Sequence, residues 1–148
     1  MLRIAVVDDE KVMLDRLEEY LTQYGHLHEV QFEIRKFHFP ELFLADYKPA
    51  YDMVLMDIDM PGMNGLETAR RMRTLDENVI LLFVTNLAQY ALHGYEVDAT
   101  DFVVKPLSYS KFEYKMTRAI KHLPHKERPY LLLKTEQGTA SVGLDSVK

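Results

Sequence analysis

Short runs of apolar residues alternate along this chain with segments in which apolar residues recur at helical spacing. Five of the runs have the length of β-strands, at residues 4–7, 32–37, 53–56, 79–84 and 102–104. The run at 79–84 is apolar at every position, which is typical of a strand buried on both faces. Strands that alternate with helices form βαβ units. We therefore expect an α/β fold with a parallel sheet from residue 1 to about 123.

Five helices are expected to cover both faces of this sheet, because each strand is followed by a segment of helical length. In four of them the apolar positions are clear: Met13, Leu17, Leu21 and Tyr24; Leu66 and Ala69; Leu87, Ala91 and Tyr95; and Phe112, Met116, Ala119, Ile120 and Leu123. Ser108 or Ser110 is placed to cap the last of these helices.

The pattern changes near the end of the chain. A polar linker bounded by two prolines covers residues 124–129, and the residues after it predict a strand, a turn at Gln137 and Gly138, and a second strand. A lone hairpin is marginally stable in water. We therefore expect one domain at 1–123 and, at 130–148, the beginning of a second domain that this chain does not complete.

Composition narrows the class of protein. The net charge of −5 argues against a main nucleic-acid contact in this segment, since such surfaces are usually basic. The chain has no cysteine, which excludes a disulfide framework and a cysteine metal site. It starts without the pattern of a targeting signal, and its longest apolar run, at 79–84, is too short to span a bilayer. We expect a cytoplasmic protein with no membrane contact.

Polar side chains follow four of the five predicted strands. Asp8 and Asp9 end the first strand, Asp57 the third, Thr85 the fourth and Lys105 the fifth. In an open parallel sheet, ligands bind outside the carboxyl ends of the strands, so these side chains should meet in one crevice. Crowded carboxylates repel one another, and a hard divalent cation with oxygen ligands, Mg²⁺ above all, relieves that repulsion.

The stretch DMVLMDIDMPG, residues 52–62, carries apolar residues up to Asp57 and then turns. By its position alone, Asp57 is a nucleophile, a metal ligand, a cap for the next helix or the polar end of a strand. Beside Mg²⁺, Lys105 and Thr85, a phosphoryl group would have its charge neutralised on several sides. A carboxylate oxygen of Asp57 would then attack phosphorus and form an aspartyl phosphate.

These motifs match a known family. Asp8-Asp9, the DIDMPGMNG run at 57–65, Thr85 and the FVVKP run at 102–106 together resemble the receiver domains of two-component response regulators. The resemblance covers residues 1 to about 123. It implies a flavodoxin-like, doubly wound (βα)5 fold with the strand order 2-1-3-4-5.

The resemblance also implies a metal site. Asp57 would be the phosphoacceptor, and Mg²⁺ would be held by Asp9, Asp57 and the backbone carbonyl of Asp59, with assistance from Asp8. In this family the acceptor is phosphorylated by a sensor histidine kinase. The domain is thus expected to be a phosphoacceptor, not an enzyme, that assists its own phosphorylation and slow dephosphorylation.

Four further residues acquire roles from the same resemblance. Lys105 and Thr85 would stabilise the phosphoryl group, and the peptide bond between Lys105 and Pro106 is typically cis. Thr85 and Phe102 would form the switch pair, in which the hydroxyl turns toward the phosphate and the ring moves inward. The surface of the fourth helix, fifth strand and fifth helix would then transmit the change, most simply through homodimerisation.

The stretch NLAQYALHGYEVDATDFVVKPL, residues 86–107, resembles the receivers attached to LytTR DNA-binding domains. Residues 130–148 resemble the opening strands of such a domain. The resemblance implies that the full protein controls transcription and that it binds DNA only through the missing remainder of this domain. Asn86 stands where receivers often have a small residue, Leu87 occupies a variable position near the phosphoryl group, and Asp59 adds a carboxylate near the mouth of the site. The lifetime of the phosphorylated state is therefore open.

Alternative hypotheses remain. Asp57-x-Asp59 also resembles the nucleophile pair of haloacid-dehalogenase-type phosphatases, although there the pair ends the first strand and the acidic metal pair comes late in the chain. A receiver that works as a docking module without phosphorylation is the third hypothesis. Taken alone, Asp8-Asp9 fit a helix cap. His26, His28 and His38 lack the spacing of a zinc site, so we expect structural or solvated roles for them.

Overall fold

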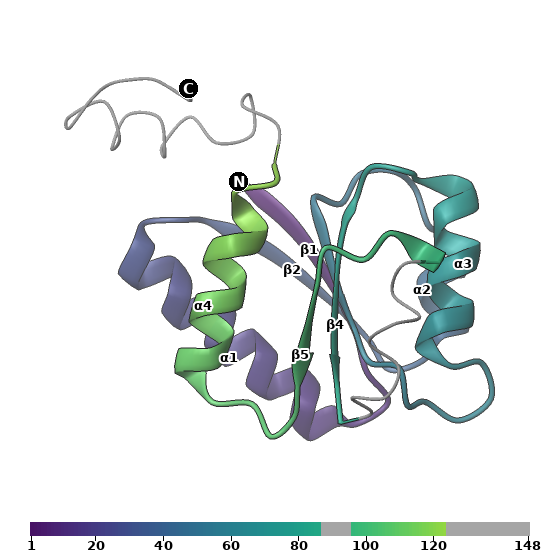
Figure 1. Cartoon of the computed structure of the whole chain (residues 1–148), viewed down its shortest axis with the longest axis horizontal. Helices are drawn as coiled ribbons and strands as arrows, with labels where there is room; N and C mark the ends of the chain where they lie inside the picture. Colours follow the sequence, from purple (N-terminus) through teal and green to yellow (C-terminus); the bar gives the residue numbers. More distant parts are fainter. Residues whose placement is uncertain (87–95, 124–148) are drawn as a thin grey trace.

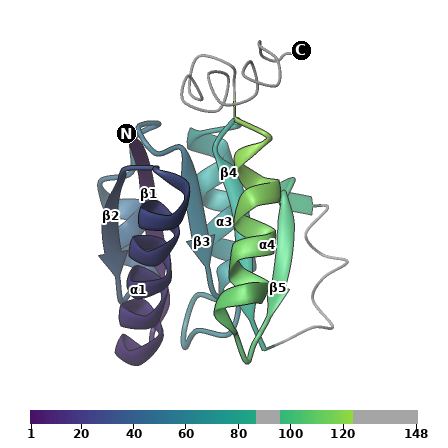
Figure 2. The same cartoon turned by 90° about the vertical axis from the view of Figure 1, so that its left-hand side faces the viewer.

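Five parallel strands form one sheet in this computed structural model, which describes residues 1–86 and 96–123. The strand order is β2-β1-β3-β4-β5 (Figures 1 and 2), which confirms the predicted flavodoxin-like fold. The strands are β1 (Leu2–Val7), β2 (Phe32–Phe37), β3 (Met53–Met56), β4 (Ile80–Thr85) and β5 (Asp101–Val104). The chain reverses its direction of travel across the sheet at β1, so the carboxyl ends of β1 and β3 lie side by side at the switch point.

Helices cover both faces of the sheet. The four described helices are α1 (Lys11–His28), α2 (Pro40–Ala45), α3 (Gly65–Leu75) and α4 (Tyr109–Ile120). α1 and α4 pack on one face, and α2 and α3 pack on the other (Figures 1 and 2). The predicted helix of Leu87, Ala91 and Tyr95, the linker at 124–129 and the hairpin at 130–148 lie outside the described residues. None of the described helices combines the length and the apolar composition that crossing a membrane requires.

The central strands supply the core because their side chains point alternately into the two helical layers. In β4, Leu82 and Val84 belong to the apolar cluster under α1 and α4, whereas Leu81 and Phe83 belong to the cluster under α2 and α3. Every residue of β3 and β4 is buried. β2, at the edge of the sheet, alternates between partly buried and exposed residues, which explains why its sequence was the most polar of the five predicted strands.

The connection from β3 to α3 is tightly packed against the strand end. Gly62 has a positive φ of 77°, which glycine adopts without steric cost. The side chain of Asn64 caps α3 by accepting a hydrogen bond from the backbone N–H of Glu67 at 3.0 Å. Gly65 begins the helix so close to the strand that a Cβ would overlap the carbonyl oxygen of Asp57. The run that follows Asp57 therefore holds the strand end in place.

Gly65→Ala should lower the free energy of unfolding by about 1–3 kcal/mol, because the added methyl group forces the backbone at Asp57 to move. Helix propensity alone would favour alanine by up to about 1 kcal/mol, so a loss of stability identifies the close approach as the cause. Urea unfolding followed by circular dichroism measures it. Gly62→Asn is the control, because a Cβ added at this position would have no atom within 4 Å and asparagine tolerates a positive φ. A Gly65→Ala variant as stable as the control would contradict the prediction.

Candidate functional site

Three carboxylates converge where β1 and β3 end. Asp8, Asp9 and Asp57 each offer an oxygen atom, and these atoms lie within 4.8 Å of one another. Asp8 follows β1 directly, and the backbone N–H of Asp57 donates to the carbonyl oxygen of Val7 at 2.9 Å. The residue exposures of Asp8 and Asp57 are only 1% and 4%, while Asp9 is more exposed. The sheet therefore forces two carboxylates into a buried place beside a third.

Lys105 reaches this cluster from the end of β5. Its Nζ lies 3.1 Å from Oδ2 of Asp8 and 3.6 Å from Oδ2 of Asp57. The side chain of Lys105 is 11% exposed, and the peptide bond to Pro106 is cis. The ammonium thus bridges the two buried carboxylates, although its strand is two places away from β3 in the sheet.

Thr85 and Phe102 lie on the neighbouring strands β4 and β5. Thr85 ends β4 and is fully buried, and its hydroxyl is one of the groups that lower the pKa of the Asp57 carboxyl. Phe102 is partly exposed, and its ring packs edge-on against Phe83 with a centroid distance of 6.4 Å. The register pairs Phe83 with Phe102 and Thr85 with Val104. The hydroxyl and the aromatic ring that the resemblance paired are therefore carried by adjacent strands.

Burial and negative charge change the acidity of Asp57. Burial raises its pKa, the negative charge of Asp8 raises it further, and together they bring it to about 6. Lys105, the Thr85 hydroxyl and the backbone N–H of Asp59 oppose this rise by favouring the ionised form. Asp57 is consequently ionised at neutral pH, and keeping this charge in a buried place lowers the free energy of unfolding.

The site is short of positive charge. Burial also raises the pKa of Asp8, against the backbone N–H of Glu10 and the charge of Lys105. Burial tends to lower the pKa of Lys105, but Asp8 and Asp57 outweigh it, so the pKa is raised overall and the ammonium stays protonated. One ammonium faces three carboxylates, all with hard oxygen donors, which suits a cation such as Mg²⁺. The residues present therefore fit the predicted metal, with Asp8, Asp9 and Asp57 to hold it.

Two predicted residues lie at the rim. The side chain of Asp59 is exposed and outside the carboxylate cluster, while its backbone N–H donates to Oδ1 of Asp57 at 3.3 Å. Its backbone carbonyl remains a predicted ligand. Asn86 is exposed directly after β4. Leu87 lies outside the described residues.

Glu10 belongs to the site and was missed by the sequence analysis. Its backbone N–H donates to Oδ1 of Asp8 at 2.9 Å. Its carboxylate lies 4.0 Å from Nζ of Lys105, and its side chain is largely exposed. The available signal was its position directly after Asp8 and Asp9, which gives the chain three acidic residues in a row at the end of β1.

The capping explanations for these acidic residues do not hold. The N-cap residue of α1 is Glu10, which makes no side-chain cap, so Asp8 and Asp9 do not cap this helix. α3 is capped by Asn64 and not by Asp57. The acidic residues at the strand ends are therefore free for other chemistry.

No histidine within residues 1–86 and 96–123 belongs to the cluster of Asp8, Asp9 and Asp57. His28 lies at the end of α1, where its Nε2 is 2.8 Å from Oε2 of Glu113 on α4. Within residues 1–86 and 96–123, the one group of three potential metal ligands is Asp8, Asp9 and Asp57. His26 and His38 are therefore not part of a metal cluster there.

Asp57→Asn should stabilise the metal-free protein at neutral pH. Because the folded carboxyl has a pKa of about 6 against 3.8 in a model compound, the folded state binds its proton more tightly. The free energy of unfolding of the wild type therefore falls as pH rises through this window and stays low above it. The amide has no charge to bury, so the variant should gain on the order of 1–3 kcal/mol at pH 7.5 and much less near pH 4.

Urea unfolding of both proteins at several pH values, without divalent cations, measures this difference. Asp59→Asn removes a neighbouring but exposed carboxylate and should change stability by less than about 0.5 kcal/mol. If Asp57→Asn raised the free energy of unfolding equally at pH 7.5 and near pH 4, ionisation of Asp57 would not be the cause.

Mg²⁺ should stabilise the wild-type protein by on the order of 1 kcal/mol at a concentration about tenfold above its dissociation constant. Asp9→Asn should lose most of this gain, because it removes one of the three clustered carboxylates while leaving the two buried ones. Asp59→Asn should keep the gain, since the predicted ligand there is the backbone carbonyl. Thermal unfolding at constant ionic strength, with and without MgCl2, measures the effect, and an undiminished gain in Asp9→Asn would contradict the assignment.

Comparisons with known proteins agree with this geometry. The family model described as "Response regulator receiver domain" matches residues 4–117. The sensory transduction protein LytT of Bacillus subtilis (strain 168) is 31% identical over 118 residues, which are 80% of this chain and 48% of that protein. The transcriptional regulatory protein LytR of Staphylococcus aureus (strain N315) is 24% identical over 117 residues, 79% of this chain and 46% of that protein. The chain thus spans about half the length of these relatives.

A solved structure shares the fold. The response regulator protein TrrA of Thermotoga maritima, in complex with Mg²⁺–BeF, matches with a TM-score of 0.66 and 30% sequence identity, over 80% of this chain and 99% of that one. The described fold, the acidic cluster and the family match over 4–117 lead to one conclusion: this chain belongs to the response regulator receiver domain family.

Proposed function

We propose that Asp57 accepts a phosphoryl group from a phosphohistidine of a sensor histidine kinase. The observation that carries this proposal is the position of Asp57, a residue that is 4% exposed and whose carboxylate lies beside those of Asp8 and Asp9 and 3.6 Å from Nζ of Lys105. A receiver domain is a phosphoacceptor signalling module and not a classic enzyme, and it implies a cognate histidine kinase. Our proposal adds that Asp57 is the acceptor and that the residues around it assist the transfer.

The transfer exchanges one bond for another. A carboxylate oxygen of Asp57 attacks phosphorus, the bond from phosphorus to the donor histidine nitrogen breaks, and that nitrogen keeps the electron pair. Lys105 and the Thr85 hydroxyl are close enough to Asp57 to meet the phosphoryl oxygens. Mg²⁺, when held by Asp8, Asp9, Asp57 and the carbonyl of Asp59, supplies further positive charge for these oxygens.

The added charge would then bias a two-state equilibrium. Phosphorylation brings a charge near −2 into a site that already holds more negative than positive groups. The hydroxyl of Thr85 would turn toward the phosphoryl group, and Phe102 would move inward from its partly exposed position. Because Phe102 lies in β5, the change reaches the surface formed by β5 and α4.

That surface has features of a docking face. Val104 is 37% exposed and Tyr114 is 59% exposed, and a shallow groove between β5 and α4 includes both of them and Phe102. Exposed apolar residues of this kind support protein contacts. We propose that this face, together with the predicted helix of residues 87–95, mediates homodimerisation on phosphorylation.

The output would be transcriptional. We propose a receiver at 1–123, a linker at 124–129 and the beginning of a LytTR-type DNA-binding domain at 130–148. Support comes from the names of LytT and of the transcriptional regulator LytR, which are about twice as long as the matched region. DNA binding would require the remainder of that domain.

Both alternative hypotheses are disfavoured, for different reasons. The family match over 4–117 disfavours the phosphatase hypothesis, since Asp57 and Asp59 lie in a receiver framework with the acidic pair at β1. A docking module that needs no phosphorylation is disfavoured by the complete site, because such a module has no use for a bridging lysine and a cation cluster. One experiment distinguishes the proposed phosphoacceptor from both alternatives.

Incubation of the full chain with acetyl phosphate and Mg²⁺ should add one phosphate, detected by intact-protein mass spectrometry. Asp57→Asn and chelation of Mg²⁺ should each abolish the adduct, because one removes the nucleophile and the other the compensating charge. Asp59→Asn is the matched control and should still be modified. Sustained turnover of a phosphate ester would favour the phosphatase. No adduct from acetyl phosphate or from a phosphorylated kinase would favour the docking module.

A further inference from the structure

Tyr20 on α1 is hydrogen-bonded to the connection that carries Lys105. Its phenolic O–H donates to the backbone carbonyl oxygen of Leu107 at 2.9 Å, although the two residues are 87 positions apart in the chain. Leu107 comes directly after Lys105 and Pro106, in the connection between β5 and α4. The hydrogen bond therefore joins the helix that follows β1 to the segment that supplies the ammonium of the acidic site.

The ring of Tyr20 is fixed by aromatic packing. It meets Tyr109 edge-on with a centroid distance of 5.6 Å and lies tilted against Phe112 at 5.5 Å. Such pairs of rings favour defined mutual orientations. Leu107 is buried in the same apolar cluster as Phe112. The hydroxyl thus reaches its carbonyl partner from a side chain that has little freedom to move.

α1 is a firm support for this contact. Leu14, Leu17 and Leu21 of α1 are buried in the core cluster that also contains Phe112 and Met116 of α4. The two helices lie on the same face of the sheet (Figures 1 and 2). Because closely packed interiors have low compressibility, a hydrogen bond to α1 fixes its partner relative to the sheet.

Lys105 is anchored on both sides along the backbone. Its own N–H donates to the carbonyl oxygen of Thr85 at 2.8 Å, which holds it to β4. Pro106 has no N–H to donate, and the hydroxyl of Tyr20 then holds Leu107. Without this second anchor, the backbone that follows Lys105 gains freedom while β5 itself stays paired with β4.

We propose that Tyr20 is a positioning residue for Lys105, which it places through the carbonyl group of Leu107. The ammonium of Lys105 lies 3.1 Å from Oδ2 of Asp8 and 3.6 Å from Oδ2 of Asp57. Small displacements matter at such distances, because a shift of about 1 Å can cost about 100-fold in rate. This role rests on the proposed function, in which Lys105 assists the transfer, and Tyr20 takes no part in the making or breaking of bonds.

Tyr24 provides a matched control one turn further along α1. Its hydroxyl forms a hydrogen bond with Oγ1 of Thr117 at 2.8 Å, so it also joins α1 to α4. Thr117 lies within α4, beyond the connection that carries Lys105. Tyr20→Phe and Tyr24→Phe thus remove the same group from the same helix, and only the first removes an anchor of Lys105.

The rate at which acetyl phosphate and Mg²⁺ add a phosphate to the full chain is the first measurement, made by intact-protein mass spectrometry. Tyr20→Phe keeps the ring and should slow the reaction by about three- to tenfold, the range that corresponds to the net free energy of one hydrogen bond. Tyr24→Phe should react at the wild-type rate. Circular dichroism confirms that both variants fold.

A double-mutant cycle separates positioning from a general loss of structure. Lys105→Ala should itself react slowly, because it removes the ammonium. Tyr20→Phe should cause no further slowing in the Lys105→Ala background, since the residue that it places is gone. A tyrosine with a merely structural role would slow both backgrounds by the same factor.

NMR of the unphosphorylated, metal-free protein gives a second readout, which does not need the transfer reaction. The Lys105 ammonium is almost fully buried and paired with Asp8, and both features slow the exchange of its protons with water. Tyr20→Phe should speed this exchange, whereas Tyr24→Phe should leave it unchanged.

Different results would refute the positioning role and the phosphoacceptor. A wild-type rate in Tyr20→Phe, equal slowing in both backgrounds or unchanged ammonium exchange would overturn the positioning role alone. A Lys105→Ala variant as fast as the wild type would overturn the role of Lys105 and that of Tyr20 with it. If the wild type formed no adduct, or Asp57→Asn still formed one, the proposed function would fail, and faster ammonium exchange in Tyr20→Phe would still support the positioning of Lys105.

Discussion

The structure depends on an electrostatic conflict at the ends of β1 and β3. Asp8 and Asp57 are both almost fully buried, and burial raises the pKa of each. Lys105 relieves the conflict by bridging them at 3.1 and 3.6 Å, but one ammonium does not balance these two carboxylates and Asp9. A buried site with excess negative charge destabilises the fold. It also favours any arrival of positive charge, and it responds strongly when more negative charge is added.

Four different strands bring these charged and polar groups together. The neighbouring strands β1 and β3 place the two buried carboxylates, and β4 and β5 supply the hydroxyl and the ammonium. Arg73 of α3 adds support below β5, since its guanidinium donates to the carbonyl oxygens of Val97 at 2.8 Å and Asp98 at 3.0 Å. The turn before β5 is therefore attached to a helix on the sheet, which limits how far the strand that carries Phe102 can shift.

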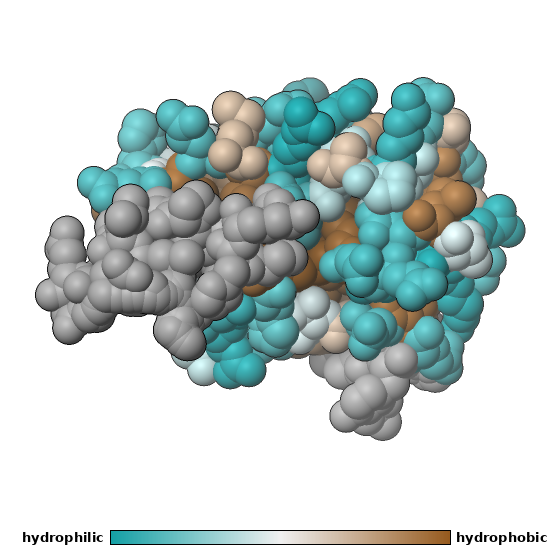
Figure 3. All heavy atoms as spheres, turned by 90° about the horizontal axis from the view of Figure 1, so that it is seen from above, coloured by the Kyte–Doolittle hydropathy of each residue, from teal (hydrophilic) through white to brown (hydrophobic). Residues whose placement is uncertain are grey.

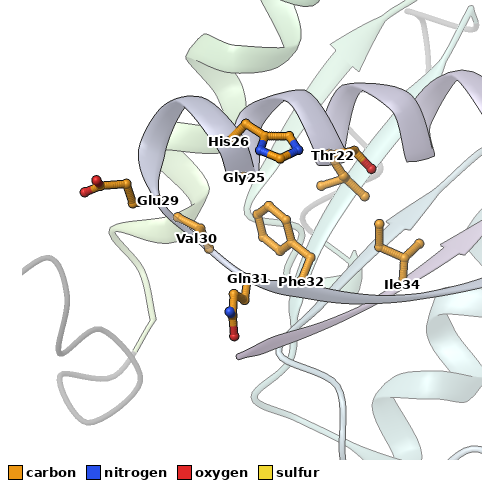
Figure 4. A pocket seen from close by; sticks show the side chains of 9 residues that line it. Thr22, Gly25, His26, Glu29, Val30, Gln31, Phe32 and Ile34 are labelled. Carbon is orange, nitrogen blue, oxygen red and sulfur yellow. The ribbon is translucent and has the colours of Figure 1, made fainter.

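Opposite ends of the sheet differ in their chemistry. The carboxyl ends of the strands carry the acidic site. At the other end, apolar residues come to the surface between polar ones (Figure 3), and a groove is lined by residues of α1 and β2 such as Thr22, Phe32 and Ile34 (Figure 4). α1 connects the two ends, because it starts next to Glu10 and its last turns line the groove.

The sequence by itself determined the fold class and the members of the site. Apolar runs of strand length and the polar residues after them predicted the parallel sheet and the gathering of Asp8, Asp9, Asp57, Thr85 and Lys105, because strand periodicity is local and the carboxyl ends of parallel strands share one edge. The strand order followed from the resemblance to receiver domains. Only the tertiary structure decided how these charges are paired. The bridge of Lys105, the contact with Glu10 and the closeness of Gly65 to Asp57 depend on distances between strands and loops, and linear spacing does not encode such distances. The groove beside β2 had no signal in the sequence for the same reason.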